Sequence, residues 1–172
     1  MPKQKKIVII VGDFFQDLEV WYPYLRFKEA GHQVVVAGLG EKVYHGKYGL
    51  SIATDRSAKG LRARDFDAVV IPGGWAADYM RRSSLKKDIV KFLKDMNKAG
   101  QVISVICHGG WMLASADIIR GRTVTAFHSI KDDLINAGAK FVDREVVVDK
   151  NLITSRKPED LPAFCHETLK KL

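Results

Sequence analysis

The sequence predicts an α/β protein built around a mostly parallel sheet with helices on both faces, in a single domain that spans residues 1–172. Apolar strand-like runs alternate with helical segments along the chain, and no linker-like stretch separates them. Several of these runs are uninterrupted, as expected of parallel strands that are buried on both faces. The hydrophobic fraction of 47% suits one domain with a sizeable core and argues against disorder.

The first third of the chain predicts two strands, a helix and a hairpin. We expect an uninterrupted apolar strand at 7–11 and a second strand at 33–38. Apolar residues at three- and four-residue spacing predict a helix over 17–30, and Gly31 ends it. Glycines between alternating segments indicate a small hairpin over 42–54.

The central part of the chain predicts the loops that would bind a ligand. Residues 66–74 are typical of a buried strand that runs into a glycine turn, 83–99 of a helix, 102–107 of another buried strand and 110–118 of a helix. Ligands bind beyond the carboxyl ends of parallel strands, so the candidate loops follow the strands at 7–11, 66–74 and 102–107. The remaining predicted elements are strands at 123–127, 146–148 and 152–155 and helices near 130–137 and from about 159.

The formal net charge of +8 raises the question of nucleic-acid binding. The sequence has no zinc-finger spacing, no basic region beside heptads and no aromatic RNA-binding signature. Nucleic acid is therefore not expected as the main partner, although the charge favours weak attraction of acidic substrates. Many basic residues are expected mostly on one solvated helical face: Arg81, Arg82, Lys86, Lys87, Lys91, Lys94 and Lys98.

Neither a membrane segment nor a secretion signal is expected. No apolar run approaches the length of a membrane span, and the apolar stretch after the basic N-terminus is short and has no cleavage site. The two cysteines are Cys107 and Cys165, and the first of them is needed as a free thiol in the hypothesis that follows. These features predict a cytoplasmic protein with reduced cysteines.

The most informative segment is the run VISVIC at 102–107, which delivers Cys107 and His108 into a turn made by Gly109 and Gly110. A strand that breaks sharply into a helix holds one side chain at the helix N-terminus, as in a nucleophile elbow. We expect that position to acidify the Cys107 thiol and make it a nucleophile. The alternative is a buried structural cysteine, and the adjacent histidine and glycines favour the nucleophile.

Two other predicted loops supply groups that a nucleophilic site needs. Gly73 and Gly74 leave their backbone amides uncovered, and together with the amide of His108 they would form an oxyanion hole. Glu19 begins the first helix, where its carboxyl group would reach a thiol on a neighbouring strand. Taken alone, the glycines are typical of a tight turn and Glu19 of a helix start.

Taken together, these motifs resemble those of a known family. The chain is similar to the ThiJ/PfpI family of the class I glutamine amidotransferase-like superfamily, and in particular to the PfpI-type intracellular proteases. The resemblance implies a flavodoxin-like α/β sandwich. The segments that carry it are DLEVWYPYLRFKEAGHQV (17–34), FDAVVIPGGWAADYMR (66–81), ICHGG (106–110), IKDDLINAGAKFVDREVVVD (130–149) and the Ser-Arg pair before Lys157.

The resemblance also implies roles for individual residues. Cys107 would be the nucleophile, with the Glu19 carboxyl beside its sulfur. The amides of Gly74 and His108 would hold the oxyanion, and His108 would be the general acid and base. Asp78 stands where the family has an acidic residue, usually glutamate, that a neighbouring subunit supplies to orient the histidine. The implied assembly is a dimer, or a hexamer built from dimers, with the sites near subunit interfaces.

The sequence departs from the protease-type members at Phe127 and His128, which replace Tyr-Pro. The phenol hydroxyl is lost and an imidazole appears beside it. His128 either replaces the missing donor or lines the pocket, together with Phe127 and Gly73.

Other classes of site are disfavoured. A glutaminase of this superfamily needs a late His-x-Glu, and residues 153–160 contain no histidine. The histidines have no metal-ligand spacing, and no nucleotide-binding glycine loop follows the first strand, so neither a metal nor another cofactor is expected. Cys165 is interpreted as a core or interface residue, with a redox partnership with Cys107 as the alternative.

Two classes of function follow. The first is a cofactor-independent cysteine enzyme that acts on an electrophilic carbonyl, either as a glyoxalase or deglycase on a small substrate or as a peptidase on a peptide. The altered residues Asp78 and Phe127 favour small carbonyls, because peptide cleavage also requires protonation of the leaving amine. The second class is a thiol-based sensor of oxidative stress, or a chaperone-like protein, in which oxidised Cys107 is the signal.

Overall fold

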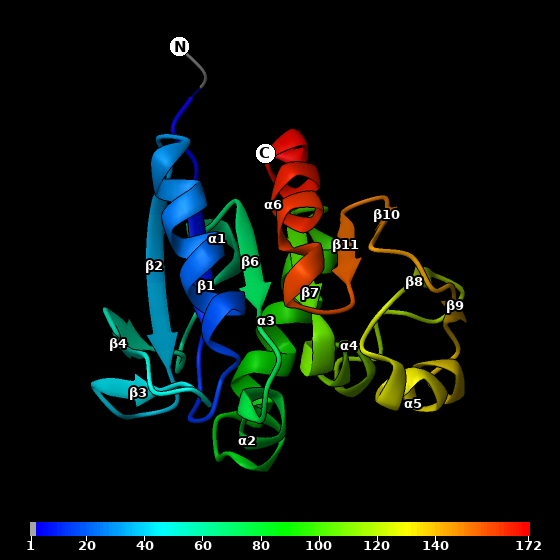
Figure 1. Cartoon of the computed structure of the whole chain (residues 1–172), viewed down its shortest axis with the longest axis horizontal. Coiled ribbons are helices and arrows are strands. Elements are labelled where there is room, and N and C mark those ends of the chain that lie inside the picture. Colours follow the sequence, from blue (N-terminus) through cyan, green and yellow to red (C-terminus); the bar gives the residue numbers. More distant parts are fainter. Residues whose placement is uncertain (1–2) are drawn as a thin grey trace.

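The computed structural model describes residues 3–172, and a seven-stranded sheet lies at its centre (Figure 1). All neighbouring strands in this sheet are parallel except the last pair, β10 and β11. The expected α/β class with a mostly parallel sheet is confirmed. In spatial order the strands are β10 (Val146–Asp149), β11 (Leu152–Ser155), β7 (Val102–Ile106), β6 (Ala68–Ile71), β1 (Lys6–Ile10), β2 (Gln33–Gly38) and β5 (Arg56–Ser57).

The three central strands form the core of the sheet. Every residue of β6 and β7 is buried, and so is every residue of β1 after Lys6. In the middle of the sheet Ile9 lies between Val36 and Val70. Each such side chain contributes about 1.5–3 kcal/mol when it leaves water. Burial on both faces explains why these strands are uninterrupted apolar runs in the sequence.

Helices cover both faces of the sheet. In Figure 1, α1 (Asp17–Glu29) and α6 (Leu161–Lys171) lie in front of the sheet, where they contact each other, and α3 (Lys86–Lys98) lies behind it. The shorter helices α2 (Ala76–Arg82) and α4 (Gly110–Ser115) pack against each other and against α3. Helix α5 (Lys131–Asn136) packs on α4.

The helix expected over 83–99 is confirmed as α3, with small differences at its two ends. The short helix α2, which was not among the expected elements, precedes it, and Ser83 between the two helices has extended backbone dihedrals. The Ser83 hydroxyl accepts a hydrogen bond from the amide of Leu85 at 3.0 Å, a local turn that competes with a continuous helix. The expectation of one solvated helical face is therefore wrong for Arg81 and Arg82, which lie on a different helix from the lysines.

Two small pairs of strands lie outside the main sheet. The expected hairpin is confirmed as the antiparallel pair β3 (Val43–His45) and β4 (Ser51–Ala53). The strand expected at 123–127 is only β8 (Thr123–Val124), which pairs in parallel with β9 (Lys140–Phe141). Neither β5 nor β9 was anticipated, because two residues are too few to show a period of two.

The carboxyl ends of β1, β6 and β7 meet at one edge of the sheet. The loops after the first two are joined by a bridge between Phe15 and Gly74, and the loop after β7 begins at Cys107. This is the edge at which parallel sheets bind ligands. Among residues 3–172 we find no helix with the length and hydropathy needed to cross a bilayer.

Candidate active site

Cys107 occupies a strained position directly after β7. Its φ of +59° lies in the left-handed region, which a residue with a side chain adopts at a cost of about 1–3 kcal/mol. Gly109 completes the turn, because a Cβ there would lie 2.6 Å from the carbonyl oxygen of Ile71. The sharp strand-to-helix turn expected from the sequence is therefore present, and it holds a thiol that is only 6% exposed.

Glu19 lies beside this thiol. It is fully buried in the first turn of α1, and its Oε2 accepts a hydrogen bond from the amide of Gly73 at 2.6 Å. A Cβ on Gly73 would lie 2.6 Å from the Cβ of Cys107 and 2.7 Å from that Oε2. The glycine is thus what allows the carboxyl group and the thiol to approach each other. Because its amide is already bonded to Glu19, Gly73 does not contribute a free donor to an oxyanion hole.

Burial changes the protonation of both groups. It raises the pKa of Glu19 to about 8, so this carboxyl group is neutral at pH 7. Burial, and secondly the negative charge of Glu19 when it is ionised, raise the pKa of the Cys107 thiol. The expectation that the turn acidifies this thiol is therefore wrong in its net direction. A neutral Glu19 removes the repulsion and can donate a hydrogen bond to the sulfur.

Two backbone amides oppose the effect of burial on Cys107. The amides of His108 and Gly74 hydrogen-bond the sulfur and lower its pKa. Gly74 has a φ of +70°, and a Cβ there would lie 2.5 Å from the amide nitrogen of Gln16, so only glycine fits. These are the two donors expected for the oxyanion, and they lie where negative charge on the sulfur or on a bound carbonyl oxygen would develop.

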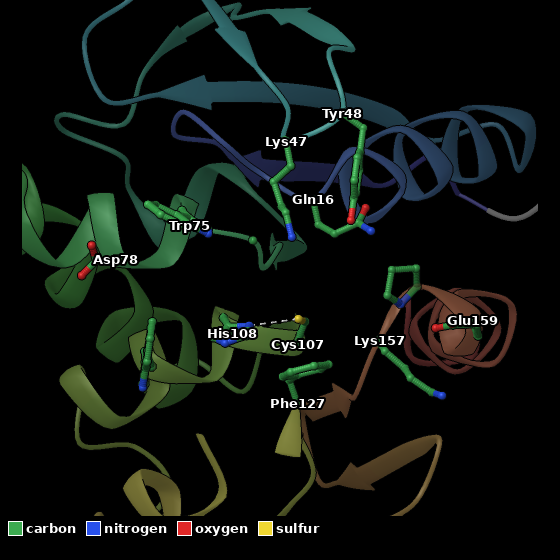
Figure 2. Close-up of a pocket in the computed structure, with 13 residues that line it drawn as sticks. Gln16, Lys47, Tyr48, Trp75, Asp78, Cys107, His108, Phe127, Lys157 and Glu159 are labelled. Atoms are coloured by element: carbon green, nitrogen blue, oxygen red, sulfur yellow. Dashed lines mark hydrogen bonds between the residues drawn. The ribbon is translucent and has the colours of Figure 1, made fainter. Parts of the chain in front are cut away.

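His108 is positioned to exchange a proton with the thiol. Its Nδ1 lies 3.3 Å from the Cys107 sulfur (Figure 2), and its Nε2 lies 3.0 Å from the hydroxyl oxygen of Ser129. The ring stacks on Phe127 with centroids 5.0 Å apart and meets the edge of Trp111 at 5.2 Å. Burial, followed by the charges of Lys47 and His128, lowers the pKa of His108, so it is a neutral base at pH 7.

Among the described residues, neither Asp78 nor His128 forms a hydrogen bond or an ion pair with Cys107 or His108. Asp78 lines the same cavity, but its carboxylate pairs with Arg82 at 2.8 Å and lies apart from Cys107 in Figure 2. Within one chain, Ser129 rather than Asp78 bonds His108. The contribution of an acidic residue by a neighbouring subunit stays a prediction. His128 is exposed and lines an adjoining cavity, which it shares with Phe127.

A cavity of about 540 Å³ opens above the thiol. Among residues 3–172, no three side chains of His, Cys, Asp or Glu are grouped so that they could hold a metal ion. The sequence did not point to several of its walls, since they come from a hairpin turn, from α2, from α4 and from the loop before α6. The lining residues are Gln16, Lys47, Tyr48, Gly74, Trp75, Asp78, Cys107, His108, Trp111, Phe127, Lys157, Pro158 and Glu159.

Comparison with known proteins identifies relatives along nearly the whole chain. A protein of Escherichia coli named protein/nucleic acid deglycase 2 is 43% identical over 171 residues, which cover 98% of each chain. A protein of Pyrococcus furiosus named deglycase PfpI is 41% identical over 167 residues, which cover 97% of this chain and 99% of the other.

A solved structure has the same fold. It is a two-domain protein of Anabaena variabilis, whose description names DJ-1/ThiJ/PfpI-like and ferritin-like domains. It superposes with a TM-score of 0.92 at 41% identity, and the match covers 97% of this chain and 49% of that one. The chain thus spans about half the length of that protein.

The family profile described as the DJ-1/PfpI family matches residues 5–171, which include the thiol, the Glu19 carboxyl group and the two backbone amides described above. The resemblance inferred from the sequence is confirmed, and this chain belongs to the DJ-1/PfpI family.

Proposed function

We propose that this chain is a cofactor-independent cysteine enzyme that converts small 2-oxoaldehydes, free or bound to an amine, into 2-hydroxy acids. The observation that carries the proposal is the contact between the Cys107 sulfur and a neutral His108 at 3.3 Å, on the floor of a cavity. Relatives at 41–43% identity that are named deglycases support the same type of chemistry.

The reaction begins with addition of the thiol to the aldehyde. The sulfur–carbon bond forms while the π electrons of the C=O bond move to the oxygen, which the amides of Gly74 and His108 hold. His108 takes the thiol proton and returns it to that oxygen, and the product is a hemithioacetal. A substrate that arrives as an amine adduct enters the same sequence when the sulfur displaces the amine.

The second half of the reaction is an internal redox step. His108 removes the proton from the former aldehyde carbon, and a proton is added to the neighbouring ketone carbon, which gives a thioester of the 2-hydroxy acid. Water then cleaves the thioester and restores the thiol. One carbon is oxidised while its neighbour is reduced, so the reaction needs no oxidant, reductant or cofactor.

Small carbonyls fit this site better than peptides do. Peptide cleavage requires His108 to protonate a leaving amine, and a carboxylate that orients the ring supports that step. In this chain the second ring nitrogen of His108 contacts a hydroxyl group instead.

A homo-oligomer remains part of the proposal. Beside Asp78 an aromatic surface is formed by Phe14, Trp75 and Tyr79, with ring centroids about 6 Å apart, and both Phe14 and Trp75 are largely exposed. Such a surface suits a second copy of the chain. If the copy supplies Asp78 to His108, mixing Asp78→Ala subunits with Cys107→Ala subunits restores part of the activity that each variant lacks alone.

The first experiment measures lactate formed from methylglyoxal by the native protein, by Cys107→Ala and by the matched control Cys165→Ala. We expect turnover that depends on Cys107 alone. A fluorogenic peptide assayed in parallel tests the peptidase alternative. Absence of turnover of both substrates, together with ready oxidation of Cys107, contradicts the enzyme and favours a thiol-based sensor.

A further inference from the structure

Lys47 occupies a prominent place in the cavity that the reaction described above does not use. It lies in the turn between β3 and β4, and in Figure 2 its amine extends from the hairpin towards Cys107 and His108. Its positive charge is felt by the buried groups, because it contributes to lowering the pKa of both Glu19 and His108. The ammonium group is therefore part of the electrostatics of the site.

The turn that carries Lys47 is fixed by a buried carboxylate. Asp17 is 3% exposed, and its two oxygens accept hydrogen bonds from the amides of Tyr48 and Leu50 at 2.9 and 2.8 Å. A Cβ on Gly46 would lie 2.5 Å from the Asp17 carboxyl carbon, so glycine is required for this approach.

The backbone of Lys47 is itself tied to the loop after β1. Its amide donates to the carbonyl oxygen of Phe15 at 2.9 Å, and the amide of Phe14 donates to the carbonyl oxygen of His45 at 2.7 Å. These bonds hold the backbone of Lys47 in place, so its side chain starts from a fixed position beside the cavity, and less entropy is lost when the charge binds a partner.

The charge of Lys47 is not neutralised within the part of the chain that the structure describes. None of the ion pairs formed by residues 3–172 includes Lys47, and none includes Lys157, which lines the opposite wall of the cavity. The Asp78 carboxylate at the rim already pairs with Arg82. Glu159 also lines the cavity, on the side of Lys157 in Figure 2, and it forms no ion pair with Lys47. The cavity thus offers an anion an ammonium group that is not paired with a carboxylate of the described residues.

We propose that Lys47 is a specificity residue that favours 2-oxoaldehydes carrying a negatively charged group, by pairing with that group while Cys107 adds to the aldehyde. Asp17 acts through Lys47 as a positioning residue. This inference rests on the proposed function and adds to it a class of substrate, the anionic 2-oxoaldehydes.

A matched pair of substrates tests the inference. The anionic member is 4,5-dioxopentanoate, which the proposed reaction and one water convert into 2-hydroxyglutarate. The neutral member is its amide, 4,5-dioxopentanamide, which has the same shape without the charge. The quantity to measure is the ratio of kcat/KM for the carboxylate to kcat/KM for the amide.

We expect the native protein to prefer the carboxylate, and Lys47→Met to lower this ratio about tenfold, as is usual for one charge pair near a protein surface that is partly shielded from water. Lys47→Arg keeps most of the preference. Lys42→Met is the matched control, because Lys42 is an exposed lysine just before β3 that does not line the cavity, and it leaves the ratio unchanged. Raising the salt concentration reduces the preference of the native protein.

Each failure has a distinct signature. A native protein that turns over both substrates without preferring the carboxylate, or a Lys47→Met variant that loses both activities equally, overturns the role of Lys47. If no 2-oxoaldehyde is turned over, the proposed function itself fails. Binding of 2-hydroxyglutarate to Cys107→Ser, followed by calorimetry, then decides the anion site alone: binding that Lys47→Met does not weaken overturns it.

Discussion

The two cysteines of this chain are both buried, yet their surroundings differ in almost every other respect. Cys165 lies inside α6 with no exposed surface, and burial raises its pKa to about 12. Burial also raises the pKa of Cys107, but its sulfur contacts His108 and two backbone amides and lies beside Glu19. Cys107 also lines a cavity, and Cys165 does not line that cavity. Reactivity is therefore expected from the neighbours of a thiol and its access to substrate, since burial is common to both.

The largest expected difference between the two cysteines is in turnover. Cys107→Ser lowers kcat/KM for methylglyoxal by about 10³-fold or more, because the hydroxyl is a far weaker nucleophile at this position. Cys165→Ser leaves the same parameter within about twofold, since its side chain touches no group of the site. Steady-state assays of lactate formation make the comparison. Equal losses in the two variants would break it.

Alkylation separates the two thiols without reference to any substrate. Iodoacetamide is expected to modify Cys107 about 10²-fold faster than Cys165 in the native protein, because the first lines a cavity and the second requires local opening of α6. Peptide mapping by mass spectrometry against time gives the two rates. Unfolding in urea provides the control, since it should bring the rates together. Similar rates in the native protein would contradict the activated site.

The protonation of Glu19 makes the free energy of unfolding depend on pH. Its pKa is about 8 in the folded chain against an ordinary value of 4.5, so the folded state binds this proton more tightly. The contribution of this proton to the free energy of unfolding is therefore fully present below pH 4.5. It is lost as the pH rises to about 8, by at most about 1.4 kcal/mol per pH unit. Glu19→Gln removes this dependence. Urea unfolding of both proteins between pH 5 and 8 measures the two slopes.

The same measurement counts the protons shared by Glu19 and Cys107. If the free energy of unfolding of the native protein varies with pH as little as that of Glu19→Gln, then Glu19 and Cys107 together hold one proton in the folded state, as they do in the unfolded chain. A thiolate would then lie beside a neutral carboxyl group. A falling stability corresponds to two protons, with the thiol intact. The slope thus tests directly whether burial or the amides dominate at Cys107.

The smallest expected effect contrasts packing with strain. Cys165→Ala costs about 1–2 kcal/mol of stability, because it opens a small cavity under α6. Cys107→Gly costs less or is stabilising, since glycine relieves the positive φ of that position at no steric cost. Thermal unfolding of the two variants in parallel compares them. A Cys107→Gly loss larger than that of Cys165→Ala would argue that the thiol is a structural group.

Much of the site could be predicted because several of its residues lie in short segments whose sequence pattern indicates the local structure. Two segments predict a strand followed by a sharp turn. One is the apolar run that ends at Cys107 before two glycines, and the other is the run that ends at the Pro-Gly-Gly turn. The assignment of Glu19 to the sulfur rests on the rule that parallel strands end at one edge, and the structure agrees. Local pattern fails just before Ser83, where Arg81 and Arg82 lie on a separate short helix and not on the helix that carries the lysines.

The sequence by itself determined the order of the strand–helix units, the position of the turn at Cys107 and the family, because hydrophobic period, glycine placement and motif order are properties of neighbouring residues. Only the tertiary structure brought Lys47 into the cavity and Ser129 to His108, left Asp78 paired with Arg82, and set the pKa of Cys107 above its ordinary value. These features depend on distances between loops far apart in the chain and on how completely water is excluded, and neither quantity is encoded in a local pattern.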